Sequence, residues 1–173
     1  MRNTLAANPS FDTARLSVLE LASENCFSPS EAFLDCIQRV LTPEVVAHLP
    51  NYFKGVNSRG QAELWLGAIM ADSRLFALLD SDRDQLIGFL FVHESDGGLA
   101  NIGYLFEQSS WGKGFATELL NGLIEWNTRT QQWQRILGGV ELENAASSRA
   151  LIKVGFEPAG EPSDDRQMYQ YKA

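Results

Sequence analysis

The chain has 173 residues, 45% of them hydrophobic, and a formal net charge of −8 at pH 7. This length and apolar content suit one compact domain spanning residues 1–173. The surplus of carboxylates argues against a nucleic-acid-binding surface, which needs clustered Lys and Arg. The longest apolar run, residues 86–92, is broken by Gly88 and is too short to span a membrane.

The chain ends and cysteines give two further expectations. Residues 1–7 lack the long apolar segment of a secretory signal, so we expect a cytoplasmic protein. Cys26 and Cys36 have no CxxC pairing and no His at metal-ligand spacing. We therefore expect unpaired thiols in or near the core and no metal site.

The first third of the chain predicts a strand followed by three helices. Residues 13–21 alternate enough to form a strand. Residues 28–31 combine an N-cap serine, a proline at the first helical position and a glutamate at the third, which predicts a helix through about Leu41. Residues 42–49 repeat this pattern and predict a second helix, and residues 58–70 predict a third.

The middle of the chain predicts three consecutive strands. The apolar runs at 75–79 and 86–92 are separated by the hydrophilic turn 80–84. A second turn, 95–98, then leads to the apolar run 102–106. Such a meander predicts antiparallel neighbours in one sheet.

A Gly-Lys-Gly turn follows this third strand and opens directly into the best-patterned helix of the sequence. The first amides of a helix lack intrahelical partners and lie at the positive end of its dipole, so they attract phosphates. Gly112 and Gly114 carry no side chain to keep an anion away, and Lys113 adds a positive charge. The turn therefore predicts a diphosphate cradle. The apolar stripe of the helix comprises Phe115, Leu119, Leu120, Leu123, Ile124 and Trp126.

Two well-known phosphate loops do not fit this turn. A Walker A loop needs a glycine five residues before the Gly-Lys pair, and Glu107 stands there. A dinucleotide-binding fingerprint needs a third glycine where the chain has Thr117. Neither nucleotide-binding fold is indicated.

The last quarter predicts two strands around a short helix. Residues 135–143 predict a strand that is bent or closely approached at Gly138 and Gly139. Residues 145–153 predict a helix that Gly155 ends. A final strand is predicted near residues 168–171.

The glycine turn resembles a motif of a known family. Trp111-Gly112-Lys113-Gly114-Phe115-Ala116 is similar to motif A of the GNAT acetyltransferases, Gln/Arg-x-x-Gly-x-Gly/Ala. A second block, Asn144-Ala-Ala-Ser147-Ser-Arg149-Ala-Leu151-Ile-Lys153-Val-Gly155-Phe156, looks like the Asn-x-x-Ser-x-Arg-x-Leu-x-Lys-x-Gly-Phe of the RimJ/RimL branch, which acetylates ribosomal-protein amino termini. The opening of the first strand, Thr-x-Arg-Leu at 13–16, is also common in that branch.

The resemblance implies an α+β fold with a mixed, mostly antiparallel sheet of about six to seven strands. Helices flank this sheet, which splits between its fourth and fifth core strands. It implies acetyl-CoA as co-substrate, with the pantetheine arm pairing as an extra strand with backbone groups freed by a bulge at Tyr104, Leu105 and Phe106. Asn144 would reach the pantetheine. The diphosphate site would comprise Trp111, Gly112, Lys113, Gly114, Phe115, Ala116 and Thr117.

The family's known base and acid are both absent here. In ribosomal-protein alanine acetyltransferases with a known base on the fifth strand, a Glu stands at the position of Gly139 and a Tyr acid at Leu151. Glu141 and Glu143 would share the face of Gly139 by strand periodicity, and we favour Glu141 as the group that receives the amine proton.

Three other residues are candidates for proton transfer or hydrogen bonding. Ser147 either bonds the thiolate or caps the helix after Asn144. Tyr104 is a second acid candidate. His93 is expected to be a satisfied strand-end histidine more often than a base.

The acceptor is expected to be a primary amine, either a small molecule or a protein amino terminus. Early aromatic residues are candidates for its pocket, although each is more often plain core: Phe27, Phe33, Tyr52, Phe53 and Trp65. A rival hypothesis is a non-catalytic module that binds or senses acyl-CoA, and a third is a subunit active only within a complex. The sequence allows a monomer or a homodimer.

Overall fold

Eight strands form one sheet in the order β1-β2-β3-β4-β5-β6-β8-β7. The computed structural model describes residues 10–21, 29–47 and 49–172. The strands are β1 Phe11–Asp12, β2 Leu16–Leu21, β3 Arg74–Asp80, β4 Gln85–Ser95, β5 Leu99–Phe106, β6 Arg135–Glu141, β7 Glu157–Pro158 and β8 Arg166–Lys172. The helices in the described ranges are α2 Glu31–Val40, α3 Arg59–Asp72, α4 Phe115–Thr130 and α5 Ala145–Lys153, with single helical turns at Asn51–Phe53 and Gln108–Ser110.

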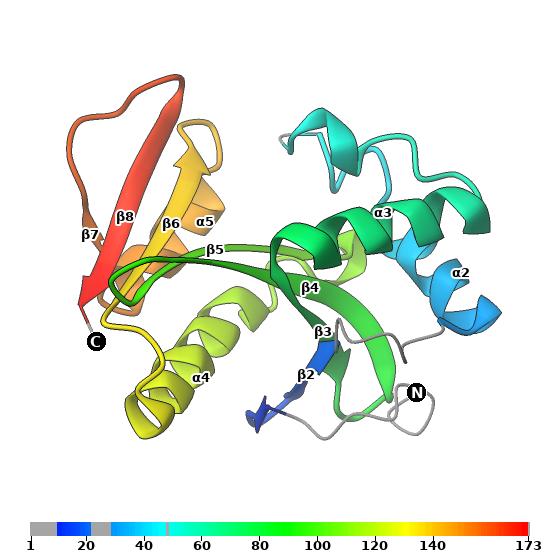
Figure 1. Cartoon of the computed structure of the whole chain (residues 1–173), viewed down its shortest axis with the longest axis horizontal. Coiled ribbons are helices and arrows are strands. Elements are labelled where there is room, and N and C mark those ends of the chain that lie inside the picture. Colours follow the sequence, from blue (N-terminus) through cyan, green and yellow to red (C-terminus); the bar gives the residue numbers. More distant parts are fainter. Residues whose placement is uncertain (1–9, 22–28, 48, 173) are drawn as a thin grey trace.

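Helices cover both faces of the sheet, with α2 and α3 on one side and α4 and α5 on the other (Figure 1). Alternation along each strand supplies a separate apolar core to each face. In β5, for example, Leu105 packs in the core under α2 and α3. Ile102 and Phe106 pack in the core under α4 and α5. The expected α+β architecture is thus confirmed.

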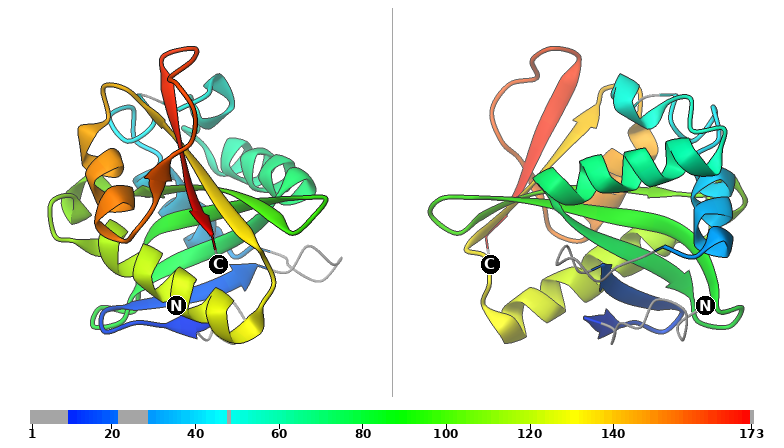
Figure 2. Two further views of the ribbon diagram at one scale, coloured as in Figure 1. Left: turned by 90° about the vertical axis from the view of Figure 1, so that its left-hand side faces the viewer. Right: turned by 45° about the vertical axis from the view of Figure 1, so that its right-hand side comes forward.

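The sheet splits between β5 and β6, its only parallel pair among the described strands. These strands pair only over Leu99–Ile102 and Arg135–Gly138. Beyond that point β6 and β8 lean away from β5 (Figure 2). The outer edge of β5 from Gly103 onward therefore has no strand partner on that side.

The predicted bulge at Tyr104–Phe106 is wrong. The register between β4 and β5 runs without a shift from Ser95↔Leu99 to Gly88↔Phe106. The irregularity lies one strand earlier, between β3 and β4 at Leu78/Leu79. The backbone edge of β5 is instead freed by the divergence of β6.

The predicted helix over residues 42–49 is also wrong. The described residues there form a turn, with Val46 N–H bonded to the Thr42 carbonyl at 3.1 Å and Leu49 N–H to the Val46 carbonyl at 3.0 Å. Pro50 disfavours helical backbone in the residue before it, and a segment this short cannot offset the cost of helix nucleation. A helix-start signal in the sequence was therefore not enough to form a helix in this segment.

Element ends differ from the prediction in three places. The N-cap of α2 is Ser30, whose hydroxyl accepts from Phe33 N–H at 3.2 Å, whereas Ser28 lies outside the described residues. The strand predicted at residues 13–21 corresponds to β2, which begins only at Leu16. Thr13 closes a turn before it, through hydrogen bonds of its hydroxyl and backbone with Leu16. The strand predicted at 135–143 ends at Glu141.

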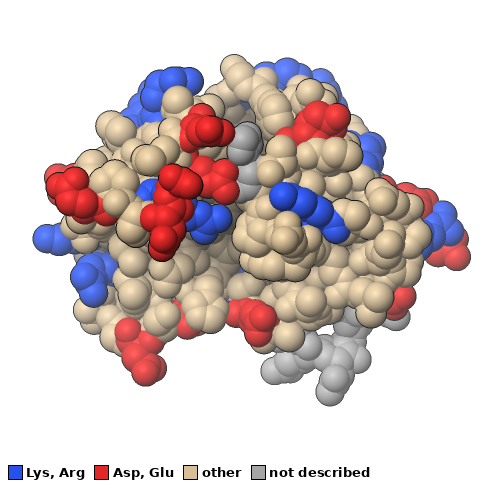
Figure 3. Space-filling view, turned by 90° about the horizontal axis from the view of Figure 1, so that it is seen from above, with Lys and Arg blue, Asp and Glu red and all other residues tan. Residues whose placement is uncertain are grey.

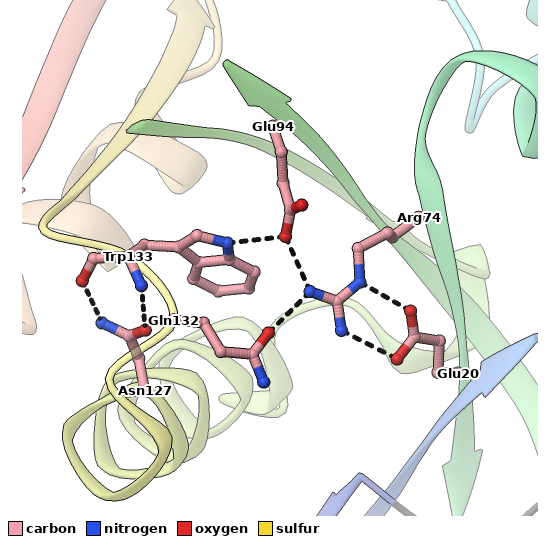
Figure 4. Close-up of polar contacts among 6 residues, drawn as sticks. All are labelled: Glu20, Arg74, Glu94, Asn127, Gln132 and Trp133. Carbon is pink, nitrogen blue, oxygen red and sulfur yellow. Dashed lines mark hydrogen bonds and ion pairs between the residues drawn. The ribbon is translucent and has the colours of Figure 1, made fainter. Parts of the chain in front are cut away.

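A polar network ties β2, β3 and β4 to the loop after α4 (Figure 4). Arg74 donates two hydrogen bonds to Glu20, at 2.6 and 2.8 Å, and one each to Glu94 at 2.7 Å and Gln132 at 2.6 Å. The Trp133 indole donates to the same Glu94 carboxylate at 2.8 Å. Burial alone would raise the pKa of Glu94, but the bonds from Arg74 and Trp133 outweigh it and lower this pKa.

We expect Arg74→Ala to lower the free energy of unfolding by about 2 kcal/mol at neutral pH, because it leaves two carboxylates without their cation. In the native protein the stabilisation through Glu94 is present above the ordinary carboxylate pKa and is lost as pH falls through the lowered folded value. The difference between the two proteins should therefore shrink in acid. Urea unfolding across pH measures both effects.

Arg83→Ala is the matched control. Arg83 is more exposed and meets only Asp80, at 3.6 Å. Such a surface pair contributes at most about 1 kcal/mol. Equal losses in the two variants would show that the Arg74 network does not stabilise the fold.

Candidate functional site

A cleft of about 1670 Å³ opens where β5 and β6 diverge. Its walls come from α3, the segment 44–53, the diverging strands, the turn before α4, and α5. Figure 3 shows the hollow from above, with acidic side chains gathered on the side of β6 and β8. Most of the predicted site lines this cleft, namely Tyr104, Leu105, Phe106, Trp111, Gly112, Gly114, Phe115, Ala116, Thr117, Glu141, Asn144 and Ser147. Lys113 does not line it.

The glycine turn has the geometry of an anion cradle. Gly112 and Gly114 have positive φ angles of 71° and 82°, which side chains rarely adopt. A Cβ added at Gly112 would meet no atom within 4 Å, so the space beside the backbone is open. Gly114 is the N-cap of α4 and its backbone carbonyl accepts from Glu118 N–H at 3.1 Å. The first-turn amides after Gly114 therefore face the cleft without helical partners, as a diphosphate requires.

A clamp from the turn between β1 and β2 holds the glycine turn. Arg15 donates to the Lys113 carbonyl at 3.0 Å, and its guanidinium lies 4.4 Å from the centre of the Phe115 ring. Glu118 accepts from Arg15 Nε at 2.7 Å and from the Thr13 hydroxyl at 2.6 Å. Burial would raise the pKa of Glu118, but these bonds lower it. The role of Arg15 in holding the glycine turn was not predicted. The Thr-x-Arg-Leu segment at residues 13–16 was the sequence signal for it.

A second anchor fixes the loop before the turn. Glu107, only 6% exposed, pairs with Arg39 of α2 and accepts from the Ser109 hydroxyl at 2.7 Å. Arg39 also donates to the Leu86 carbonyl at 2.6 Å. The loop is thus held from both sides of the sheet before any ligand binds.

Trp111 stands half exposed where most of the superfamily has Gln or Arg. Its indole N–H donates to the Phe106 carbonyl at 2.8 Å. Because this bond already uses one lone pair of the Phe106 carbonyl, that carbonyl is less available to a ligand. The backbone groups of Tyr104 and Leu105 are better placed to pair with an extended ligand along the edge of β5.

Tyr104 and Ser147 meet on the α4 and α5 side of the cleft. The Tyr104 hydroxyl is buried and makes no hydrogen bond of good geometry in the described part of the chain. Burial raises its pKa, and the Ser147 side chain offsets only part of this rise. The phenol therefore stays protonated at neutral pH and is available as a donor. Asn144 caps α5, accepting from Ser147 N–H at 3.1 Å.

The opposite side of the cleft faces α3, and we call it the α3 side. Its floor is formed by Phe91 and His93 of β4, Asn101 and Gly103 of β5, and Gly139 of β6. Cross-strand pairing puts His93 beside Asn101 and Phe91 beside Gly103. Gly138 approaches Leu151 on the other face, so its neighbour Gly139 points to the α3 side. The two glycines add no side chains to this floor, and the Met168 side chain lies beside Gly139, with its Sδ 3.0 Å from where a Cβ would stand.

The aromatic candidates divide into two groups. Tyr52, Phe53 and Trp65 line the cleft. Phe33 is 1% exposed and belongs to the core under α2 and α3. Phe27 lies outside the described residues.

The two candidate carboxylates are not equivalent. Glu141 ends β6 on the α3 side and lies 3.8 Å from Arg166 Nη2. Glu143 follows the end of the strand, so the strand periodicity on which its placement was predicted does not extend to it. Both line the cleft.

Other kinds of site find no support in the described ranges. No group of three His, Cys, Asp or Glu residues there could hold a metal ion. No helix in those ranges has the length and hydropathy needed to cross a bilayer. Cys36 is a half-buried free thiol, and Cys26 lies outside the described residues.

Comparison with known proteins identifies the family. The family model described as an acetyltransferase (GNAT) domain matches residues 31–157, and the chain therefore belongs to the GNAT acetyltransferases. The uncharacterized N-acetyltransferase p20 of Bacillus licheniformis is 32% identical over 87 residues, 49% of each chain. The alignment thus spans about half the length of this relative.

Solved structures share the fold at low identity. The microcin C7 self-immunity acetyltransferase MccE, solved with acetyl-CoA and AMP, superposes with a TM-score of 0.73 at 14% identity, over 99% of both chains. RimL, the ribosomal L7/L12 α-N-protein acetyltransferase solved with coenzyme A, gives 0.72 at 16% identity, over 95% of this chain and 98% of that one. At such identities the likeness shows the fold alone.

Proposed function

We propose that this chain transfers the acetyl group of acetyl-CoA to a primary amine by direct attack in a ternary complex. One observation carries the proposal: a single cleft runs from the glycine cradle, along the unpaired edge of β5, to the open α3 side. A thioester and an amine can therefore meet in it from opposite sides. No covalent enzyme intermediate is needed.

The coenzyme side of the cleft is built from backbone groups. The amides of residues 112–117 hold the diphosphate, flanked by Trp111, and the β5 edge at Tyr104 and Leu105 pairs with the pantetheine arm. Asn144 has its Oδ1 engaged in capping α5, which leaves its side-chain amide N–H groups to donate to the same arm. When bound, acetyl-CoA supplies an activated acyl thioester.

The catalytic groups lie on both sides of this strand edge. Tyr104 and Ser147 are placed to stabilise negative charge as it develops on the sulfur. Glu141 and His93 are the candidate proton acceptors on the α3 side. Glu141 also pairs with Arg166, and this pair of opposite charges helps to orient the acceptor amine.

The acceptor is a cationic amine, either a protein amino terminus or a small molecule. Four carboxylate residues line the cleft: Glu44, Asp72, Glu141 and Glu143. Each offers an ion-pair partner to an ammonium group, although the basic residues Arg149, Lys153 and Arg166 line the same cleft. The sequence blocks that resemble those of the RimJ/RimL branch favour a protein amino terminus.

Release of free thiol from acetyl-CoA tests the proposal. We expect release above hydrolysis background with at least one member of a panel containing an alanine-initiated peptide, a lysine side-chain mimic and spermidine. The acetylated amine should appear in equal amount by mass spectrometry. A chain that binds coenzyme A by calorimetry yet acetylates no amine is a binding module, and that result would overturn the enzymatic proposal.

A further inference from the structure

His93 occupies the centre of the α3 side. It lies on β4 beside Asn101, and the carboxyl-terminal end of α3 passes over it. The same cleft that reaches the glycine cradle is lined by this imidazole. Gly103 and Gly139 add no side chains to the floor around it, where Phe91 and Met168 are the neighbouring side chains. An amine entering from the α3 side would pass the ring.

A backbone carbonyl fixes the tautomer of this ring. His93 Nδ1 lies 2.8 Å from the Asp72 carbonyl oxygen. Asp72 is the last residue of α3, so its carbonyl has no intrahelical donor. Because a carbonyl only accepts, Nδ1 must carry the proton. The neutral ring then presents the lone pair of Nε2.

The surrounding charges leave this nitrogen accessible. Asp72 comes from α3, and Arg135 lies on the same face of the sheet, from β6. The Glu141 and Arg166 pair lies toward the far end of β6. Glu94, next along β4, points to the opposite face, where it bonds Arg74 and Trp133. Within the described residues the His93 ring is hydrogen-bonded through Nδ1 and not through Nε2, and His93 is an exposed residue.

We propose that His93 Nε2, directly or through one water, receives the proton of the acceptor amine; this rests on the proposed function. The amine nitrogen forms a bond to the acetyl carbonyl carbon, and the carbon–sulfur bond breaks with its electron pair going to sulfur. The amine proton passes to Nε2 and later to solvent. The sulfur takes its proton from the Tyr104 side. Glu141 then attracts the ammonium group rather than deprotonating it.

The tautomer is tested without turnover. Long-range nitrogen–proton correlation spectra of uniformly ¹⁵N-labelled protein distinguish protonated from unprotonated ring nitrogens. The sequence contains two histidines, so His93→Asn assigns the signals. We expect the neutral form of the ring to carry its hydrogen on Nδ1. Hydrogen on Nε2 of the neutral ring would overturn the proposal, because that nitrogen would have no lone pair to offer.

Kinetics of His93→Asn test the role. Asn keeps a donor near the Asp72 carbonyl but lacks a base, so the fold and the KM for acetyl-CoA should persist. At about pH 7 we expect kcat/KM for the best amine of the panel to fall about 100-fold. The loss should shrink as pH rises and the free amine becomes abundant, and added imidazole should restore part of the rate. A merely structural role would give none of this pH dependence or rescue.

Glu141→Gln distinguishes between the two candidate proton acceptors, Glu141 and His93. It should lower kcat/KM less than His93→Asn does and retain the pH dependence of the native protein. A His93→Asn variant within about threefold of the native rate at every pH would overturn the role of His93 alone. A native protein that acetylates no amine would overturn the proposed function and this inference together.

Discussion

Gly114→Glu should abolish measurable binding of coenzyme A, raising its Kd at least about 100-fold, which corresponds to about 2.7 kcal/mol. The substitution places a carboxylate beside the first amides of α4, where the diphosphate belongs. It also forces a side chain onto a residue with a φ of 82°. Titration calorimetry with coenzyme A measures the effect directly, with no need for the acceptor.

Gly97→Glu is the matched control. Gly97 has a φ of 77°, and an added Cβ there would meet no atom within 4 Å, whereas one at Gly114 would lie 3.7 Å from Arg15 Nη2, an ordinary van der Waals contact. Gly97 lies in the turn between β4 and β5, outside the cleft, so its substitution adds the same charge and a similar backbone strain elsewhere. Its Kd should stay within about twofold of the native value. Undiminished binding by Gly114→Glu would show that the glycine turn is not the diphosphate site.

Tyr104→Phe should lower kcat about 10- to 100-fold while leaving coenzyme A affinity unchanged. In the proposed complex the backbone of Tyr104 contacts the coenzyme, whereas its phenol donates toward the sulfur. Because the hydroxyl has no good hydrogen bond in the described structure, its removal should leave the unfolding free energy equal or slightly higher. Steady-state kinetics with the best amine, together with urea unfolding, separate the chemical role from a structural one.

Tyr171→Phe serves as the comparison for this effect. Tyr171 packs against Phe156 with ring centres 5.5 Å apart and does not line the cleft. Its removal should leave kcat within about twofold. If Tyr104→Phe also leaves kcat unchanged, or if it raises the Kd for coenzyme A, the phenol does not protonate the sulfur.

Local sequence signals predicted the parts of the fold that depend on local physics. The glycine turn and the apolar stripe of α4 predicted an N-terminal cradle, and both glycines have the positive φ angles that only glycine adopts readily. The predicted bounds of α5, residues 145 and 153, agree with the structure, and Gly155 was the signal for its end. These features need only the propensities of neighbouring residues.

The errors arose where distant segments decide the structure. The free edge of β5 comes from its separation from β6, which no pattern within residues 102–106 encodes. The clamp of Arg15 on Lys113 joins residues 98 positions apart. The bond from His93 to the end of α3 spans 21 positions and depends on how α3 crosses the sheet. Sequence analysis could name these residues but could not bring them together.

A crystal structure with coenzyme A bound would test the central claim most directly. We expect the diphosphate to accept hydrogen bonds from the amides of residues 112–117 and the sulfur to lie in the gap between β5 and β6, near the Tyr104 hydroxyl. His93 should then face the sulfur from the α3 side across an open space. Coenzyme A bound elsewhere on the chain, or with its sulfur directed away from this gap, would contradict the account.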